Sequence, residues 1–123
     1  RTFWRVALDV KWFHDPRAKE YLDNAAIFFN HEWNKNKIFS SLYNVDGVKI
    51  STDESISTNV GPLSVFLVTN KNPGEEVYKK LFTDKFKSDK GYWGTGKNYY
   101  DQNWAWFGTA LYTENFLLPE ELQ

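Results

Sequence analysis

The sequence predicts an all-α fold of about five helices, in which helices that need cover on several sides alternate with amphipathic helices. The segment Tyr99–Tyr112 is rich in Tyr, Trp and Phe and has no continuous polar face. The segment Arg1–Phe13 has the same character at the other end of the chain. A helix that is apolar on more than one side is normally enclosed by other elements. We therefore expect both segments to be enclosed helices.

The composition narrows the possible classes of function. A length of 123 residues allows one domain or a piece of one. Six Trp, seven Tyr and ten Phe indicate an aromatic core or an aromatic-lined binding surface. The net charge of −1 argues against a nucleic-acid or anionic-membrane binder, which would carry a basic excess. Without Cys there is neither a disulfide framework nor a thiolate zinc site.

The start of the sequence indicates a piece of a longer chain. No apolar run reaches the roughly 18–20 residues that a membrane span requires. The chain contains no Met and begins inside a predicted helix. We therefore expect an internal or processed fragment.

The first predicted helix, Arg1–Phe13, carries its polar residues in one stripe. Arg1, Arg5 and Asp9 recur every four residues, so they share one side of the helix. We expect an ion pair between Arg5 and Asp9. The alternative is that the stripe faces a cavity.

A break at residues 14–16 separates this helix from the next. Asp15 can cap a helix, and Pro16 suits its first position. The second helix is predicted to run to about Trp33 as an ordinary amphipathic outer helix. Its predicted apolar face comprises Ala18, Leu22, Ala25, Ala26, Phe29 and Trp33, and its polar face comprises Arg17, Lys19, Glu20, Asp23, Asn24 and Glu32.

The middle of the chain is predicted to contain an irregular segment and then a third helix. Residues 34–55 are mixed in character, with a turn signal at Asp46-Gly47 that favours a short hairpin, and they end in a polar loop. The apolar residues 57–68 predict a helix with Gly61-Pro62 in or near its first turn. A strand over residues 64–69 is the alternative, because β-branched residues are frequent there.

Two further helices complete the prediction. Asn72-Pro73-Gly74-Glu75 has the chemistry of a helix start, and the helix is predicted to run to about Lys87 with Phe86 on its buried side. Residues 88–97 form a Gly-rich loop. Asn98 then caps the final helix, Tyr99–Tyr112, and residues 116–123 form a closing segment.

The predicted order alternates inner and outer helices. A toroid of helical hairpins would produce this pattern, and so would an α-solenoid. No sequence repeat of fixed period is present, which weakens the solenoid.

Several short motifs give little indication of chemistry. The segment 91–97 lacks the glycine spacing of a phosphate loop. His14 and His31 are isolated, and Ser40-Ser41 lacks the context of a nucleophile. Asp53-Glu54 could form an acid–base pair, although adjacent carboxylates in a loop are usually solvated. We expect neither a metal nor a cofactor.

Aromatic residues around the last helix suit a carbohydrate, since sugars present flat C–H faces to aromatic rings. Tyr92, Trp93, Tyr99 and Tyr100 lie on a loop or at a helix start, where a groove would open. We expect the later rings, such as Trp104, to belong to the core.

Over nearly its whole length the sequence resembles the C-terminal third of glycoside hydrolase family 8. No single motif decides the resemblance, which depends on the order and spacing of several. These are residues 1–9 (RTFWRVALD), Trp12-Phe13, residues 15–19 (DPRAK), Gly61-Pro62, Tyr99-Tyr100-Asp101, Leu111-Tyr112 and Asn115-Phe116.

The resemblance implies a fold and a site. Members fold as an (α/α)6 barrel, so residues 1–123 would be the C-terminal part of one such domain. They hydrolyse β-1,4-linked polysaccharides with inversion, which needs two separated carboxyl groups. The acid would lie in the N-terminal part and the base just before Arg1, so this chain would hold no catalytic residue. Arg1, Arg5, Tyr99 and Tyr100 would contact substrate, and Asp101 departs from the small or amide residue of cellulase-type members.

The resemblance also implies a polysaccharide substrate, most readily cellulose or another β-glucan, and secretion from the cell. The N-terminal part of the same enzyme would be the partner, and the fragment alone would be inactive and would not fold stably. A non-catalytic carbohydrate-binding module and a helical protein-interaction unit are the alternatives.

Overall fold

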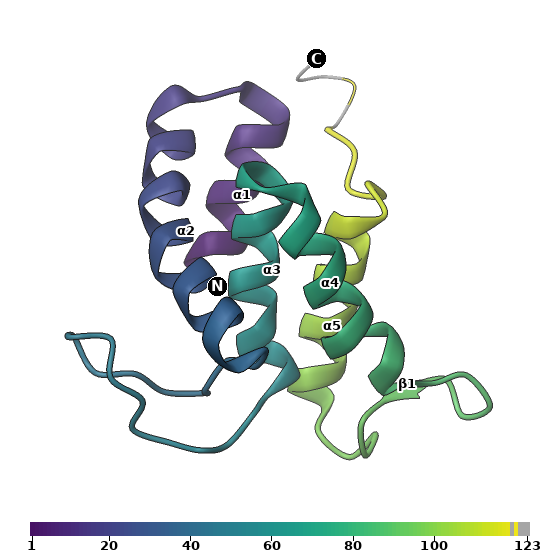
Figure 1. Cartoon of the computed structure of the whole chain (residues 1–123). Coiled ribbons are helices and arrows are strands. Elements are labelled where there is room, and N and C mark those ends of the chain that lie inside the picture. The colour runs from purple at the N-terminus through teal and green to yellow at the C-terminus, as the bar shows by residue number, and fades with distance from the viewer. Residues whose placement is uncertain (119, 121–123) are drawn as a thin grey trace.

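The computed structural model describes residues 1–118 and 120. The described part contains five α-helices and one short antiparallel hairpin (Figure 1). The helices are α1 (Thr2–Phe13), α2 (Pro16–Asn36), α3 (Ile56–Thr69), α4 (Lys71–Leu81) and α5 (Tyr99–Tyr112). A 3-10 turn, η1 (Thr83–Lys85), leads into the strands β1 (Phe86–Lys87) and β2 (Tyr92–Trp93). The all-α prediction is confirmed.

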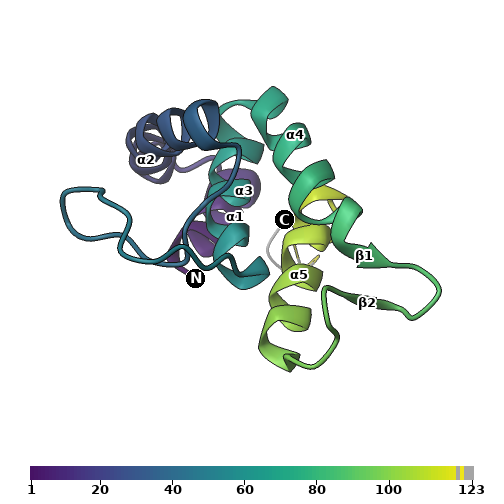
Figure 2. The same cartoon turned by 60° about the horizontal axis from the view of Figure 1, so that its bottom comes forward.

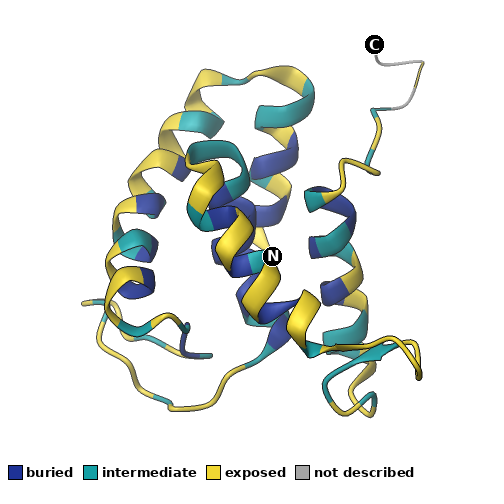
Figure 3. Ribbon diagram, turned by 45° about the vertical axis from the view of Figure 1, so that its right-hand side comes forward, coloured by how far each residue is buried: buried dark blue, intermediate teal, exposed yellow. Residues whose placement is uncertain are grey.

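The helices alternate in direction. Helices α1, α3 and α5 begin at the same end of the molecule, whereas α2 and α4 run the opposite way (Figures 1 and 2). Helix α3 packs against each of the other four helices. The buried positions of the helices face one another across the interior (Figure 3). The starts of α1, α3 and α5 are therefore gathered at one end, where their side chains can form a common site.

The enclosed helix is α3. All of its residues from Asn59 to Phe66 are buried. The two terminal helices each keep an open side, with Arg5 exposed on α1 and with Tyr99 and Trp106 exposed by 78% and 55% on α5. The prediction that α1 and α5 are enclosed is therefore wrong for this structure. The physical reason is that α1 packs mainly against α2 and α3, and α5 mainly against α3, so the described elements leave one side of each helix without cover.

The helix starts follow the sequence signals in two places. Asp15 Oδ1 accepts hydrogen bonds from the amides of Arg17 and Ala18, and Pro16 occupies the first position of α2. Asn98 Oδ1 accepts from the amides of Tyr100 and Asp101 at the start of α5. Both predicted caps are confirmed, as is the full extent of α5. Helix α2 extends one turn further than predicted, to Asn36.

The two helices in the middle differ from prediction in detail. Residues 64–69 are helical, so the strand alternative is wrong, and Pro62 lies in the second turn of α3, close to the first turn as predicted. Helix α4 begins at Lys71 with Asn70 as its cap position, so residues 72–75 lie inside the helix.

The helix predicted to reach Lys87 ends early, at Leu81. The chain then turns back as a hairpin, in which Phe86 pairs with Trp93 and their ring centroids lie 4.8 Å apart. This cross-strand aromatic pair holds the hairpin. Phe86 is 40% exposed rather than buried, and the predicted loop over residues 88–97 contains β2.

The irregular segment between α2 and α3 folds back onto α2. Its hairpin consists of a bridge between Tyr43 and Lys49 around the turn at Gly47, which confirms the predicted turn. The segment covers Glu32, which is only 6% exposed although it was expected on the outer polar face. There the carboxylate of Glu32 pairs with Lys49, whose Nζ lies 3.3 Å from Glu32 Oε2.

The expected ion pair on α1 is not observed. Among the described residues no ion pair joins Arg5 to Asp9, and Arg5 Nη1 instead donates to the carbonyl of Arg1 over 3.4 Å. Both side chains are exposed. Solvation of two exposed charges leaves little free energy for holding them together.

The closing segment packs against α1 where it is described. Phe116 lies with its ring centroid 5.1 Å from that of Trp4, and its carbonyl accepts a hydrogen bond from Trp12 Nε1 over 3.0 Å. Residues 119 and 121–123 of the predicted segment lie outside the described residues. None of the described helices is both long and apolar enough to cross a membrane.

Candidate functional site

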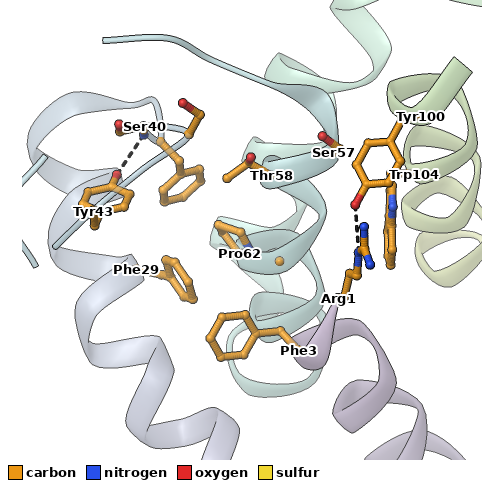
Figure 4. Close-up of a pocket in the computed structure, with 13 residues that line it drawn as sticks. Arg1, Phe3, Phe29, Ser40, Tyr43, Ser57, Thr58, Pro62, Tyr100 and Trp104 are labelled. Atoms are coloured by element: carbon orange, nitrogen blue, oxygen red, sulfur yellow. Dashed lines mark hydrogen bonds between the residues drawn. The ribbon is translucent and has the colours of Figure 1, made fainter. Parts of the chain in front are cut away.

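A cavity of about 370 Å³ lies at the end of the molecule where α1, α3 and α5 begin (Figure 4). Four helices and the segment between α2 and α3 contribute to its walls. The lining residues are Arg1, Phe3, Phe29, Phe39, Ser40, Ser41, Tyr43, Ser57, Thr58, Gly61, Pro62, Tyr100 and Trp104. The volume is that of a small-ligand pocket, and the lining combines aromatic rings with hydroxyl groups.

Arg1 and Tyr100 form one side of the cavity. The Nε of Arg1 donates a hydrogen bond to the Tyr100 hydroxyl over 2.8 Å, and the guanidinium lies 5.3 Å from the centre of the Tyr100 ring. These contacts fix the plane of the guanidinium. Among the described residues nothing accepts a hydrogen bond from the two terminal Nη groups of Arg1, so they remain available to a ligand hydroxyl or carboxylate.

Two aromatic side chains, Phe3 and Phe29, form a second apolar wall. Their rings meet edge to face, with centroids 5.3 Å apart. The ring of Phe3 packs closely against α3 at Gly61, where an added Cβ would lie 3.3 Å from Phe3 Cδ2. A glycine at this position therefore lets the Phe3 ring approach the helix closely and form part of the cavity wall.

A proline inside α3 removes one helical hydrogen bond beside the cavity. Pro62 has no N–H, so the carbonyl of Thr58, four residues earlier, does not receive the usual helical hydrogen bond. Both residues line the cavity. The Thr58 side chain gives this wall a hydroxyl that can donate to or accept from a polar ligand.

The segment between α2 and α3 supplies the wall opposite Tyr100, where Figure 4 shows Ser40 and Tyr43. The Tyr43 hydroxyl accepts from the amide of Ser40 over 2.9 Å and donates to Glu32 Oε2 over 3.1 Å. Burial raises the pKa of the Tyr43 hydroxyl, and the hydrogen bond to Glu32 adds to this effect. Tyr43 is therefore a neutral group that anchors the wall to the buried Glu32.

The structure brings two of the four predicted site residues together. Arg1 and Tyr100 line the cavity. Arg5 lies exposed one turn further along α1, and Tyr99 is 78% exposed and does not line the cavity. Tyr92 and Trp93, also considered for sugar contact, are in the hairpin and do not line the cavity; Trp93 is hydrogen bonded to Gln102.

Sequence reasoning missed most of the other walls. Trp104 belongs to the core, as expected, but it also lines the cavity, which was not expected. In the sequence, Phe3 belongs to a helix predicted to be enclosed and Phe29 to the apolar face of an amphipathic helix, so both were expected in the core. Ser40 and Tyr43 lie in an irregular segment, and their mixture of hydroxyls and apolar residues was the one available signal. Nothing in the sequence places that segment opposite Tyr100.

The described residues show what the cavity can do chemically. Among the described residues that line the cavity, Arg1 is the only one with a charged side chain. Asp53 is exposed outside the cavity, and Glu54 pairs with Lys85 over 2.8 Å. His14 and His31 are exposed, and no group of three His, Asp or Glu side chains in the described part could hold a metal ion. The arrangement therefore suits binding of a polar, ring-shaped ligand through hydrogen bonds and ring contacts.

Comparison with curated proteins identifies one relevant similarity. Endoglucanase A of Acetivibrio thermocellus is 32% identical to this chain over 96 residues, which cover 76% of the chain and 20% of that protein. The chain thus spans about a fifth of the length of the curated relative it matches. No protein-family description matches the chain. No solved structure matches it either. The chain is therefore similar to a segment of a glycoside hydrolase.

Proposed function

We propose that this chain is the C-terminal part of a secreted, inverting glycoside hydrolase of family 8 that acts on β-1,4-linked polysaccharide, with cellulose or another β-glucan as the preferred substrate. In this proposal residues 1–123 belong to one (α/α)6 domain, whose N-terminal part supplies the acid and the base. Arg1 and Tyr100 contact the sugar at the cavity. Arg5 and Tyr99 lie further out, where only a longer chain of sugars would reach them.

The observation that carries the proposal is the Arg1–Tyr100 pair at an aromatic cavity lined with hydroxyls. Aromatic rings such as Trp104 match the C–H faces of a pyranose, and the free Nη groups of Arg1 and the Thr58 hydroxyl match its hydroxyl groups. The similarity to an endoglucanase supports the same ligand class.

The open sides of the terminal helices support a larger domain. Phe13 on α1 is 54% exposed, Tyr21 on α2 47%, and Trp106 on α5 55%. Exposed aromatic residues at both edges of a layer of alternating helices are what a section of a toroid would show. In the proposed barrel, helices from the N-terminal part cover these edges.

The test is an assay of the full-length protein against β-glucan, xylan, chitosan and starch. We expect hydrolysis of β-glucan, with products of inverted anomeric configuration when followed by proton NMR at early times. Replacing Arg1 with Ala should lower kcat/KM by roughly a hundredfold, since a charged hydrogen-bond donor to the sugar contributes about 1.5–3 kcal/mol.

The matched control is Arg17→Ala, which removes an arginine that lies outside the cavity on α2. It should leave kcat/KM within about twofold of the parent value. Binding of β-glucan without hydrolysis would contradict the enzymatic proposal and favour a carbohydrate-binding module. Absence of any sugar-induced change in Trp fluorescence would favour a helical protein-interaction unit.

A further inference from the structure

The start of α3 is capped by a side chain from another helix. Ser55 occupies its N-cap position but makes no side-chain cap hydrogen bond. The amide of Ser57 instead donates to Oδ1 of Asp101 on α5 over 3.2 Å. An N-cap side chain normally accepts from the second or third helical amide, so Asp101 performs for α3 the role that a local cap would perform.

Asp101 makes two further hydrogen bonds, one with Ser55 at the start of α3 and one with Asn98 at the start of its own helix, α5. Its Oδ1 accepts from the Ser55 hydroxyl over 3.0 Å, and its Oδ2 accepts from Asn98 Nδ2 over 3.1 Å. Because the single proton of the Ser55 hydroxyl is used in this way, Ser57 Oγ is the donor in its hydrogen bond to Ser55 Oγ. One carboxylate thus lies at the N-terminal ends of both α3 and α5, where negative charge is favoured.

These contacts join two walls of the cavity. Ser57 and Thr58 line it from α3, while Tyr100, the residue before Asp101, lines it from α5. Asp101 itself does not line the cavity. We propose that Asp101 is a positioning residue, which holds the first turn of α3 against the first turn of α5 and so fixes the distance across which Thr58 and Tyr100 bind one sugar unit. The sugar part of this inference rests on the function proposed above.

The contacts of Asp101 also explain why this carboxylate stays out of the cavity. The sequence places a carboxylate directly after the Tyr99-Tyr100 pair, and a carboxylate there could have entered the sugar site. In the structure its Oδ1 accepts hydrogen bonds from the start of α3, and its Oδ2 accepts one from Asn98. The role therefore depends on acceptor geometry, and Asn, which keeps one acceptor oxygen, should replace Asp in it.

The first measurement uses amide hydrogen exchange on the full-length protein without sugar. Asp101→Ala should raise the exchange rate of residues 55–58 and 99–104 by roughly tenfold, because it removes the acceptors that join the two helix starts. Asp101→Asn should leave these rates within about threefold of the parent. Asp15→Ala is the matched control, since it removes an N-cap carboxylate of α2 that lies outside the cavity, and it should affect only the first turn of α2.

The second measurement separates positioning from stability through steady-state kinetics on β-glucan. Asp101→Ala should raise KM roughly tenfold and leave kcat within about twofold, since chemistry occurs elsewhere and sugar binding is lost. Asp101→Asn should restore KM, and Asp15→Ala should not change it.

Three results would overturn the inference: unchanged exchange in Asp101→Ala, equal KM effects of Asp101→Ala and Asp15→Ala, or no restoration by Asp101→Asn. If the parent protein acts on no glucan, the proposed function fails. The exchange measurement then still decides whether Asp101 joins the two helix starts.

Discussion

Helices α3 and α5 are both fourteen residues long, and they illustrate two ways to bury a helix. Helix α3 contains one aromatic residue and no charged residue, and it is enclosed by the other four helices. Helix α5 is dominated by aromatic residues, yet it leaves Tyr99 and Trp106 largely exposed. The comparison shows that small and branched side chains allow neighbours to approach on all sides, whereas large rings fill one side and extend beyond it.

The two helices meet where α5 has its smallest residue. A Cβ added at Gly108 would lie 3.1 Å from Phe82 and 3.2 Å from Val60. Close approach at this glycine brings the aromatic face of α5 over the aliphatic face of α3. The rings of α5 then reach sideways to α1, as Trp104 does toward Trp4 with centroids 6.2 Å apart.

The largest effect should come from opening a cavity beside α3. Phe66→Ala removes a fully buried ring and should lower the free energy of unfolding by about 3–5 kcal/mol. Tyr99→Ala removes a ring at the start of α5 that is 78% exposed and that the proposed function leaves open to sugar, so it should cost about 1 kcal/mol or less. Urea denaturation of the full-length protein would measure both, and equal losses would contradict the distinction between the two helices.

The contact between the helices should be nearly as sensitive. Gly108→Ala improves helix propensity by about 1 kcal/mol, but overpacking against buried neighbours costs about 1–3 kcal/mol. We expect a net loss of about 1 kcal/mol, because Phe82 and Val60 are both almost fully buried and cannot move aside. Asn103→Ala, on the exposed side of the same helix, is the control and should change stability little. A gain in stability for Gly108→Ala would contradict close packing of α5 against α3 at this glycine.

The smallest effect concerns the loss of stability in acid. This loss should depend on Asp15 at the start of α2 and not on the contacts of α3. The hydrogen bonds from Arg17 lower the pKa of Asp15 from 3.8 to about 2. A carboxyl group with a lowered folded-state pKa stabilises the protein above its unfolded-state pKa and loses that contribution as the pH falls through the folded-state value. The thermal midpoint should therefore drop more steeply between about pH 4 and pH 2 in the parent than in Asp15→Ala.

Helix α3 provides the control for this experiment. The segment Ile56–Thr69 contains no titratable side chain. The destabilisation caused by Phe66→Ala should therefore be the same at both ends of this pH range. Identical pH profiles for the parent and Asp15→Ala would contradict the assigned role of Asp15.

Local chemistry determined the helix boundaries that the sequence predicted well. Asp15-Pro16 and Asn98 satisfy the free amides of the helices that they begin, so their signals hold in any tertiary setting. The start of α3 had no such signal, because its cap is Asp101, which lies more than forty residues later in the chain. The end of α4 was also misplaced, because the Phe86–Trp93 pair overrides the helical pattern.

The sequence by itself determined that the chain is helical, where two of its helices begin, and that Arg1 and Tyr100 are candidates for binding a sugar. Only the tertiary structure decided that α3 is the enclosed helix and that Arg1 meets Tyr100 across ninety-nine positions of sequence. It also decided that Glu32 is buried beneath the segment carrying Tyr43. Periodicity records which side of a helix is apolar, whereas a cavity depends on which segments cover that side, and long-range packing alone fixes this.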